Sequence, residues 1–152
     1  MMKHLLTILS VLLVTTFANA QSASQIKWSY EAKKIADKTY EIHITATLNG
    51  NWHIYSQNAG VEGPIPTTFT FVKNPLLNIE GQPAEVGKLI KKNEEVWGGT
   101  VNYYEKNVKF VQKVKVKGNV KTNLAGKVEF ILCSDNKCLP PAEVDFTVSI
   151  GG

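Results

Sequence analysis

The two cysteines of the chain, Cys133 and Cys138, are separated by four residues. Apolar residues alternate before them at 128–132 and after them at 144–150, which predicts a strand, a tight loop and a second strand. The Asp-Asn pair within the loop is favourable for a turn. Facing residues of an antiparallel pair lie about 4.5–5.5 Å apart, within the span of a disulfide. We therefore expect the two sulfur atoms to be able to bond.

The shortness of the loop limits what such a bond contributes to stability. In the chain-entropy model it restrains the unfolded chain by about 2 kcal/mol, against about 4.7 kcal/mol for a loop of a hundred residues. A bond of this kind can be broken and remade without unfolding the domain, which favours a redox role, although hairpin disulfides without chemistry exist. On geometry and composition alone, a redox-active pair and a structural bridge are equally open.

No metal site is expected from the cysteines and histidines. Zinc sites in small domains draw on four ligands with short spacings, whereas this chain has two cysteines, and His43 and His53 lack the finger spacing.

The first twenty residues have the pattern of a signal peptide. Lys3 and His4 form a short basic start, an apolar run follows at 5–17, and Ala18-Asn19-Ala20 is a small-x-small cleavage site. We therefore expect a signal peptide over residues 1–20 and a single domain over 21–152, with no stable membrane anchor after cleavage. A retained N-terminal anchor is the alternative. Export would place the cysteines in an oxidising compartment, and we expect the periplasm.

The charge of the chain gives no sign of a nucleic-acid partner. The net charge is +4, and none of the basic residues is arginine, the residue that reads bases and phosphates in bidentate contacts. The lysines are spread along alternating segments such as 109–117, as on a solvated strand face.

The rest of the chain predicts an all-β fold. Apolar and polar residues alternate in most segments, for example at 40–48 and 108–116, and no segment has a helical stripe. We predict about eight or nine short strands in an immunoglobulin-like antiparallel β-sandwich. Residues 120–124 are expected to form a crossing segment or a weak strand, and residues 128–132 a strand that leads to Cys133. Residues 91–99 are expected to form a loop with an exposed Trp97.

Three stretches of sequence carry a family resemblance. They are Gly-Asn-Trp-His-Ile-Tyr-Ser at 50–56, Glu-Glu-Val-Trp-Gly at 94–98, and the run from Cys133 to Pro141, Cys-x4-Cys-Leu-Pro-Pro. In this order, in an exported β-protein, they resemble the N-terminal periplasmic domain of the thiol:disulfide interchange protein DsbD. The resemblance covers residues 28–150, and the cysteine run is its most specific part.

This resemblance implies a thiol-disulfide oxidoreductase of the protein-disulfide reductase type that needs no cofactor. In the family the domain receives reducing equivalents by way of a membrane conduit and passes them to thioredoxin-fold periplasmic proteins. By analogy Cys138 would form the mixed disulfide with a partner and Cys133 would resolve it. The membrane-bound thiol reductant would here be a separate protein. The alternative is a non-catalytic exported β-sandwich that binds a partner and carries a structural hairpin disulfide.

The family also shields its cysteine pair with a cap loop of two acidic residues, aromatics and glycine. The matching positions are Glu94, Glu95, Val96, Trp97 and Gly98. Val96 stands where the family often has an aromatic residue, so Val96 and Trp97 are expected to share the covering role. The cysteine spacing is also one residue shorter than in the best-known members.

Four further residues are candidate neighbours of the pair: Trp52, Tyr55, Lys137 and Pro140. For Trp52 and Tyr55, packing in the core or at its rim is the stronger alternative. Lys137 would favour a thiolate at the adjacent Cys138. His53 is expected on a polar strand face.

Overall fold

Strands account for nearly all the regular structure in residues 21–152, which are the residues that the computed structural model describes. The expected signal peptide lies outside the described residues. Within them, the strands are β1 Ile26–Ala36, β2 Thr39–Leu48, β3 His53–Tyr55, β4 Thr68–Phe71, β5 Leu77–Val86, β6 Ile90–Glu94, β7 Gly99–Glu105, β8 Asn107–Val116, β9 Lys121–Phe130, β10 Leu132–Cys133 and β11 Ala142–Gly151. One 3-10 helix, η1, covers Glu95–Trp97.

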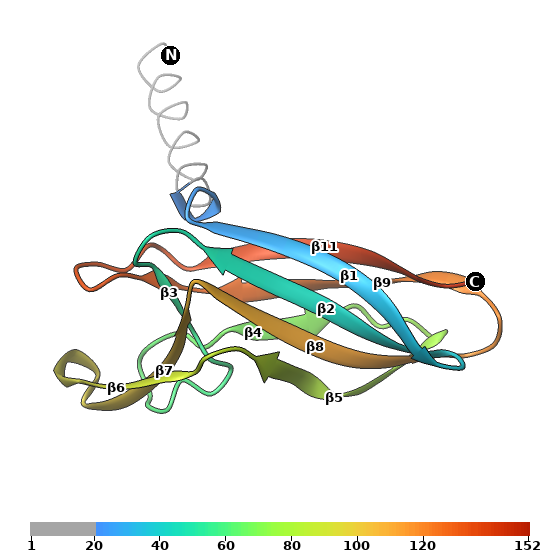
Figure 1. The fold of residues 1–152 in the computed structure, drawn as a ribbon, viewed down its shortest axis with the longest axis horizontal. Helices are drawn as coiled ribbons and strands as arrows, with labels where there is room; N and C mark the ends of the chain where they lie inside the picture. Colours follow the sequence, from blue (N-terminus) through green and yellow to red (C-terminus); the bar gives the residue numbers. More distant parts are fainter. Residues whose placement is uncertain (1–20) are drawn as a thin grey trace, which may run out of the picture.

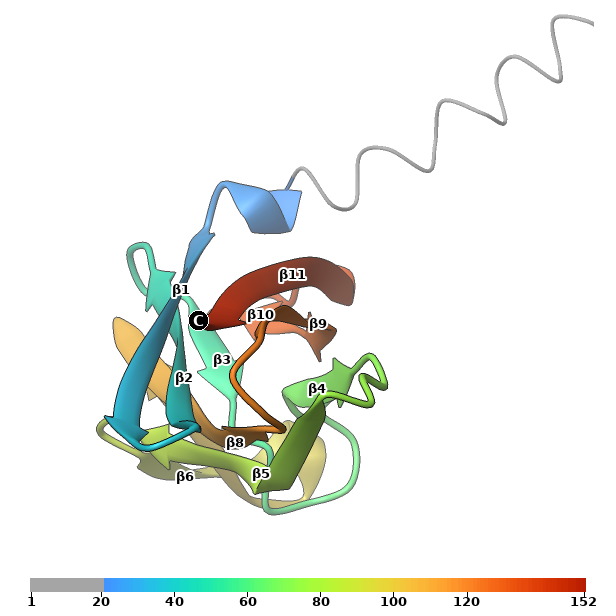
Figure 2. The same ribbon diagram turned by 90° about the vertical axis from the view of Figure 1, so that its right-hand side faces the viewer.

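All strand pairings are antiparallel and form three sheets. One sheet has the order β1-β2-β8-β5 and another the order β11-β9-β4, and these two enclose the core (Figure 2). The third sheet, β10-β3-β7-β6, lies at one end of the molecule (Figure 1). The all-β antiparallel sandwich expected from the sequence is confirmed.

The core follows from the alternation in the long strands. On β2, Ile42, Ile44 and Ala46 are fully buried, and they alternate with residues that keep some exposure. Their side chains face the opposite sheet, where Val128 and Phe130 of β9 are also buried. Burying an aliphatic side chain of this size contributes about 1.5–3 kcal/mol, so these alternating strands dominate the stability of the domain.

The structure has eleven strands, more than the eight or nine expected, and it differs from the expected boundaries in two places. β9 runs without a break from Lys121 to Phe130, its buried face includes Gly126, and Leu132, expected in the same strand as Phe130, belongs to β10. A Cβ at Gly126 would lie 2.6 Å from the backbone oxygen of Thr70, so glycine lets β4 approach closely. The expected loop at 91–99 contains the edge strand β6, which has no apolar alternation because its side chains are mostly exposed.

The chain leaves the β9 sheet at Ile131, which places the cysteines at the end of the sandwich. Leu132 and Cys133 form β10 and pair with Ile54 and His53 of β3. The loop from β10 to β11 therefore lies at the same end of the molecule as β3, β6 and β7 (Figure 1). Three segments that are distant in sequence meet there: β3, the hairpin of β6 and β7, and the cysteine loop.

Candidate functional site

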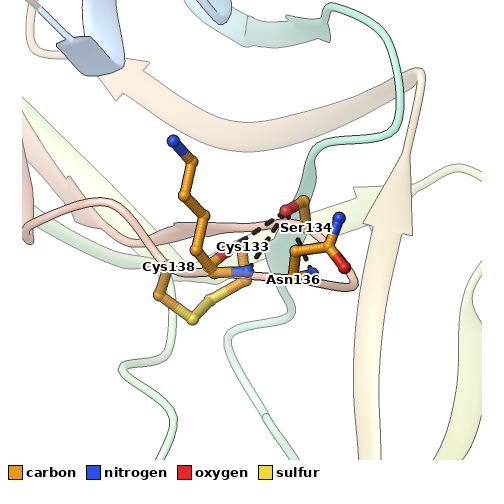
Figure 3. The surroundings of a disulfide bond; sticks show 5 residues. Cys133, Ser134, Asn136 and Cys138 are labelled. Atoms are coloured by element: carbon orange, nitrogen blue, oxygen red, sulfur yellow. Dashed lines mark hydrogen bonds between the residues drawn. A yellow bond between two sulfur atoms is a disulfide. The ribbon is translucent and has the colours of Figure 1, made fainter.

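The two cysteines close a tight hairpin. Cys133 and Cys138 form an antiparallel bridge with Cα atoms 4.0 Å apart, and their sulfur atoms are bonded. The amide of Ser134 donates to the carbonyl of Lys137 at 2.7 Å, which closes the turn. The hydroxyl of Ser134 accepts from the amides of Asn136 and Lys137, both at 3.3 Å (Figure 3). The loop is thus ordered by its own hydrogen bonds, independently of the sulfur bridge.

The two sulfur-bearing residues differ in exposure. Cys133 is 2% exposed and belongs to a small apolar cluster with Tyr55, Val101 and Tyr103, whereas Cys138 is exposed. Thiol–disulfide exchange needs access to one sulfur along the S–S axis. Of the two cysteines, Cys138 is therefore the more accessible to a protein thiol.

An open cleft of about 470 Å³ lies over the disulfide. Both cysteines and the intervening loop residues form one side. The other lining residues are His53 and Tyr55 of β3, Lys92 and Glu94 of β6, and Val96 and Trp97 of η1. The cleft therefore joins the cysteine hairpin to the segment that sequence comparison suggested as a cap.

The structure brings three of the five cap-segment residues to the cleft. Glu94, Val96 and Trp97 line it, whereas Glu95 is exposed and Gly98 follows the helix in a left-handed conformation with φ of 71°. Trp97, expected to be exposed, is partly buried against the cluster that contains Cys133. Val96 is 79% exposed. Both residues line the cleft, but the indole of Trp97 is packed against the cluster, whereas the side chain of Val96 is largely exposed.

The loop before β4 supports Trp97 from the other side. A Cβ at Gly63 would lie 2.5 Å from the indole of Trp97, and Gly63 has a φ of 130°, a conformation that side chains other than glycine rarely adopt. The close contact fixes the plane of the indole against the loop. The position of Trp97 therefore depends on glycine at residue 63.

Of the four candidate neighbours, two line the cleft and two do not. Tyr55 and Lys137 line it. Trp52 packs against the main core, and the ammonium of Lys137 lies 6.0 Å from its ring centroid. Pro140 is exposed outside the lining residues. Trp52 thus meets the site through Lys137 of the cysteine loop.

Charged groups cross the mouth of the cleft. The ammonium of Lys92 lies 3.0 Å from the carboxylate of Glu94 and 3.8 Å from that of Asp135, so it joins β6 to the cysteine loop. The hydrogen bond with Glu94 raises the pKa of Lys92. Because the side chains of Lys92 and Asp135 are both accessible to solvent, the contact between β6 and the cysteine loop is weak and can open.

Two tyrosines pack in the cluster that contains Cys133, one of them, Tyr55, also lines the cleft, and a carboxylate anchors the residues next to them. Burial raises the pKa of Tyr55 and of Tyr103. The carboxylate of Glu85 accepts from the hydroxyl of Ser56 at 2.8 Å and from that of Tyr104 at 2.7 Å. Burial, followed by the contact with Glu85, raises the pKa of Tyr104. Glu85 therefore links Tyr104 of β7 and Ser56, the residue that follows β3, to β5.

Sequence reasoning missed His53, which is 6% exposed and lines the cleft rather than a polar face. All three residues of β3 are buried, so polar–apolar alternation gives no signal there. The spacing of His53 and Tyr55 could have revealed it, because residues two apart on a strand share a face. If Tyr55 lies beside the cysteine pair, His53 is expected on the same side of the strand. Lys92 and Tyr103 were missed as well.

No helix in residues 21–152 is long and apolar enough to cross a membrane. In the same part of the chain, no three His, Cys, Asp or Glu side chains are grouped so that they could hold a metal ion.

The fold and the site define a β-sandwich domain with a hairpin disulfide between one buried and one exposed cysteine, both of which line an open cleft. The family model described as "Thiol:disulfide interchange protein DsbD, N-terminal" matches residues 18–150, and the chain belongs to this family. A search of curated proteins gave no match.

Solved structures support the same fold. The reduced N-terminal domain of DsbD from Neisseria meningitidis is 18% identical, with a TM-score of 0.53 over 82% of this chain and 86% of that one. The N-terminal periplasmic domain of ScsB from Proteus mirabilis is 17% identical, with a TM-score of 0.56, and the match covers 86% of this chain and 47% of that one. A complex of the Neisseria meningitidis DsbD and PilB N-terminal domains matches with a TM-score of 0.50, at 16% identity over 79% of this chain and 80% of that one.

Proposed function

We propose that this domain passes reducing equivalents between thioredoxin-fold proteins in the periplasm through Cys133 and Cys138. The observation that carries the proposal is the unequal exposure of the two cysteines in a hairpin that other contacts already hold closed. Membership of the DsbD N-terminal family supports it. So does the existence of a complex between a DsbD N-terminal domain and a domain of another protein.

The exchange runs through a mixed disulfide on Cys138. A thiolate of the reduced donor attacks the exposed sulfur of Cys138, and the electron pair of the S–S bond leaves on Cys133. The second donor thiol then releases the donor as its own disulfide, and Cys133 and Cys138 remain as a dithiol. With an oxidised client the steps run in the opposite sense: Cys138 attacks the client disulfide and Cys133 resolves the intermediate. A membrane-bound thiol reductant is the donor that we propose.

The cap segment restricts this chemistry to suitable partners. Trp97 packs against the apolar cluster that contains Cys133 and lines the cleft over the bond, and Lys92, which contacts Glu94, also reaches Asp135 of the cysteine loop. A partner that displaces the segment gains access to Cys138, as in other proteins whose loops gate a reactive group. In this scheme Val96 meets the partner first, because its side chain is largely exposed.

The test uses a reduced thioredoxin-type donor and single-cysteine variants. Cys138→Ser is expected to abolish transfer, whereas Cys133→Ala is expected to trap a mixed disulfide through Cys138, visible by non-reducing electrophoresis and mass spectrometry. The wild-type protein is the control for exchange. If neither variant changes the reaction with any such donor, the proposal fails.

The reduction potential separates a relay from a structural bridge. A potential of about −120 to −270 mV, measured by equilibration with glutathione, is typical of exchange proteins, whereas structural disulfides lie below about −300 mV. We expect a value in the first range. A value well below about −300 mV would instead favour a binding module whose disulfide only shapes the loop.

A further inference from the structure

His53 lies directly opposite Cys133 in the sheet that forms the site. In the pairing of β3 with β10, His53 is the partner of Cys133, and in the pairing of β3 with β7 it is the partner of Glu105. Directly paired residues of antiparallel strands project from the same face, with Cβ atoms about 4.5–5.5 Å apart. Cys133, His53 and Glu105 therefore form a row across three adjacent strands, in the order thiol, imidazole, carboxylate.

The ring of His53 is held in place by aromatic neighbours. Its centroid lies 4.3 Å from that of Tyr103 and 5.4 Å from that of Tyr55, which meets it edge-on. Among the described residues neither ring nitrogen makes a hydrogen bond to a protein group, and the ring lines the cleft. By contrast, His43 on β2 uses its Nε2 to contact Glu41 at 3.0 Å. His53 is thus positioned by packing while its nitrogens stay available for a proton.

The charges around His53 suit a group that gains a proton for a short time. Burial lowers the pKa of His53, and the carboxylates of Glu105, Asp135 and Glu94 oppose that shift, while the ammonium of Lys92 adds to it. A neutral imidazole is able to accept a proton, and the three carboxylates would stabilise the imidazolium that forms. Two further titratable residues, Tyr55 and Tyr103, pack on the ring, and Lys137 lines the same cleft.

We propose that His53 is the base that takes the proton from the Cys133 thiol when this cysteine resolves a mixed disulfide on Cys138. This inference rests on the proposed exchange function. The proton moves from the sulfur of Cys133 to a ring nitrogen of His53, which leaves a thiolate and an imidazolium. The thiolate attacks the sulfur of Cys138, a new S–S bond forms within the hairpin, and the bond from Cys138 to the partner breaks. The partner sulfur leaves with the electron pair and is protonated by the imidazolium or by water.

The burial of Cys133 is the reason that a base is needed. An ordinary cysteine thiol has a pKa of about 8.5, so only about 3% is thiolate at pH 7, and burial in apolar surroundings lowers that fraction further. A base beside the thiol can raise the reactive fraction by up to roughly thirtyfold at pH 7. Well above the thiol pKa the thiolate forms without help, so the advantage disappears.

The experiment follows both steps with a small chromogenic aromatic disulfide, dithiobis(nitrobenzoate), in place of a protein partner. In the reduced protein, attack by Cys138 releases one nitrothiobenzoate anion, and resolution by Cys133 releases a second in a slower phase. We expect His53→Gln to slow the second phase roughly tenfold or more at about pH 7 and less than twofold at about pH 9.5, with the first phase unchanged. His43→Gln is the matched control and is expected to behave as the wild type in both phases.

Two results would overturn the inference. One is a second phase that is unchanged by His53→Gln at about pH 7. The other is a second phase slowed by the same factor at both pH values, which would assign His53 a purely structural role. The reagent tests the role of His53 without a protein partner. A failure of the proposed relay would therefore show separately: the wild-type protein would react with the reagent in two phases but would not exchange with thioredoxin-type donors.

A second measurement leaves His53 in place and covers the case in which His53→Gln does not fold. In reduced Cys138→Ser, the ultraviolet absorbance of the Cys133 thiolate and the NMR signals of the His53 ring are followed against pH. The proposal expects the two titrations to be coupled, with the ring signals shifting as the thiolate forms. A thiolate that appears without any change in the ring signals would overturn the inference.

Discussion

Reduction of the disulfide is expected to weaken the domain only slightly. The bond joins residues separated by five positions, and the chain-entropy model for a loop of this length gives about 7 cal/mol/K, or about 2 kcal/mol at 25 °C. Domains of this kind are stable by about 5–15 kcal/mol, so the reduced form stays folded. With about 2.1 cal/mol/K of unfolding entropy per residue over roughly 130 residues, the loss corresponds to a fall in Tm of about 7 °C.

The assay is urea unfolding by far-ultraviolet circular dichroism, with and without a phosphine reductant. Chemical reduction keeps both cysteine side chains. A Cys133→Ser variant would instead place a hydroxyl group at a buried position. The double variant Cys133→Ala/Cys138→Ser is the control, because the reductant should not change its midpoint. Loss of cooperative unfolding on reduction, or a decrease above about 4 kcal/mol, would refute the view that this bond is separable from the fold.

Three other perturbations test the surroundings of the site. Trp97→Ala is expected to raise the rate of disulfide reduction by dithiothreitol several-fold, whereas Val96→Ala, at a side chain 79% exposed, should change it little. Glu85→Gln is expected to lower the free energy of unfolding by about 1–3 kcal/mol in urea, because the hydroxyl of Tyr104 loses a charged acceptor. The lowered pKa of His53 means that the unfolded chain binds more protons, so stability should fall as the pH drops below about 6.5, and His53→Gln should remove that part of the pH dependence.

Each of these expectations has an opposite outcome. Equal reduction rates for the two cap-segment variants would show that Trp97 does not cover the bond. A stability change below about 0.5 kcal/mol for Glu85→Gln would show that the carboxylate does not hold β3 and β7 in place. A pH dependence of unfolding in His53→Gln that matches the wild type would assign that dependence to other groups.

The sandwich could be predicted from the sequence because its long strands each bury one face. On β2 and β8 the apolar side chains recur every second residue, and burial of one sheet face produces that period. The cysteine hairpin could be predicted for a related reason, since turn residues and two flanking alternating runs specify it locally. These features depend on neighbours in the chain and need no knowledge of distant contacts.

The rest of the site depends on contacts between distant segments, which the local pattern does not encode. β6 lies at a sheet edge with both faces largely solvated, so nothing in its sequence marks it as a strand. β3 is buried on both faces, which hides the cleft-facing His53. Exposure of Trp97 is expected from the sequence because residues 91–99 are mostly polar and end in two glycines. In the structure its indole packs against Gly63 and the cluster that contains Cys133.

The unequal exposure of the two cysteines also bears on damage by peroxide. In the dithiol form, Cys138 is the sulfur that an oxidant meets first, and its initial product would be a sulfenic acid. A second thiol whose Cα lies 4.0 Å away in the closed hairpin can condense with that acid and release water. The product is the intramolecular disulfide, which the proposed donor would reduce again, so the irreversible sulfinic and sulfonic acids would be avoided. The hairpin therefore protects its own reactive sulfur.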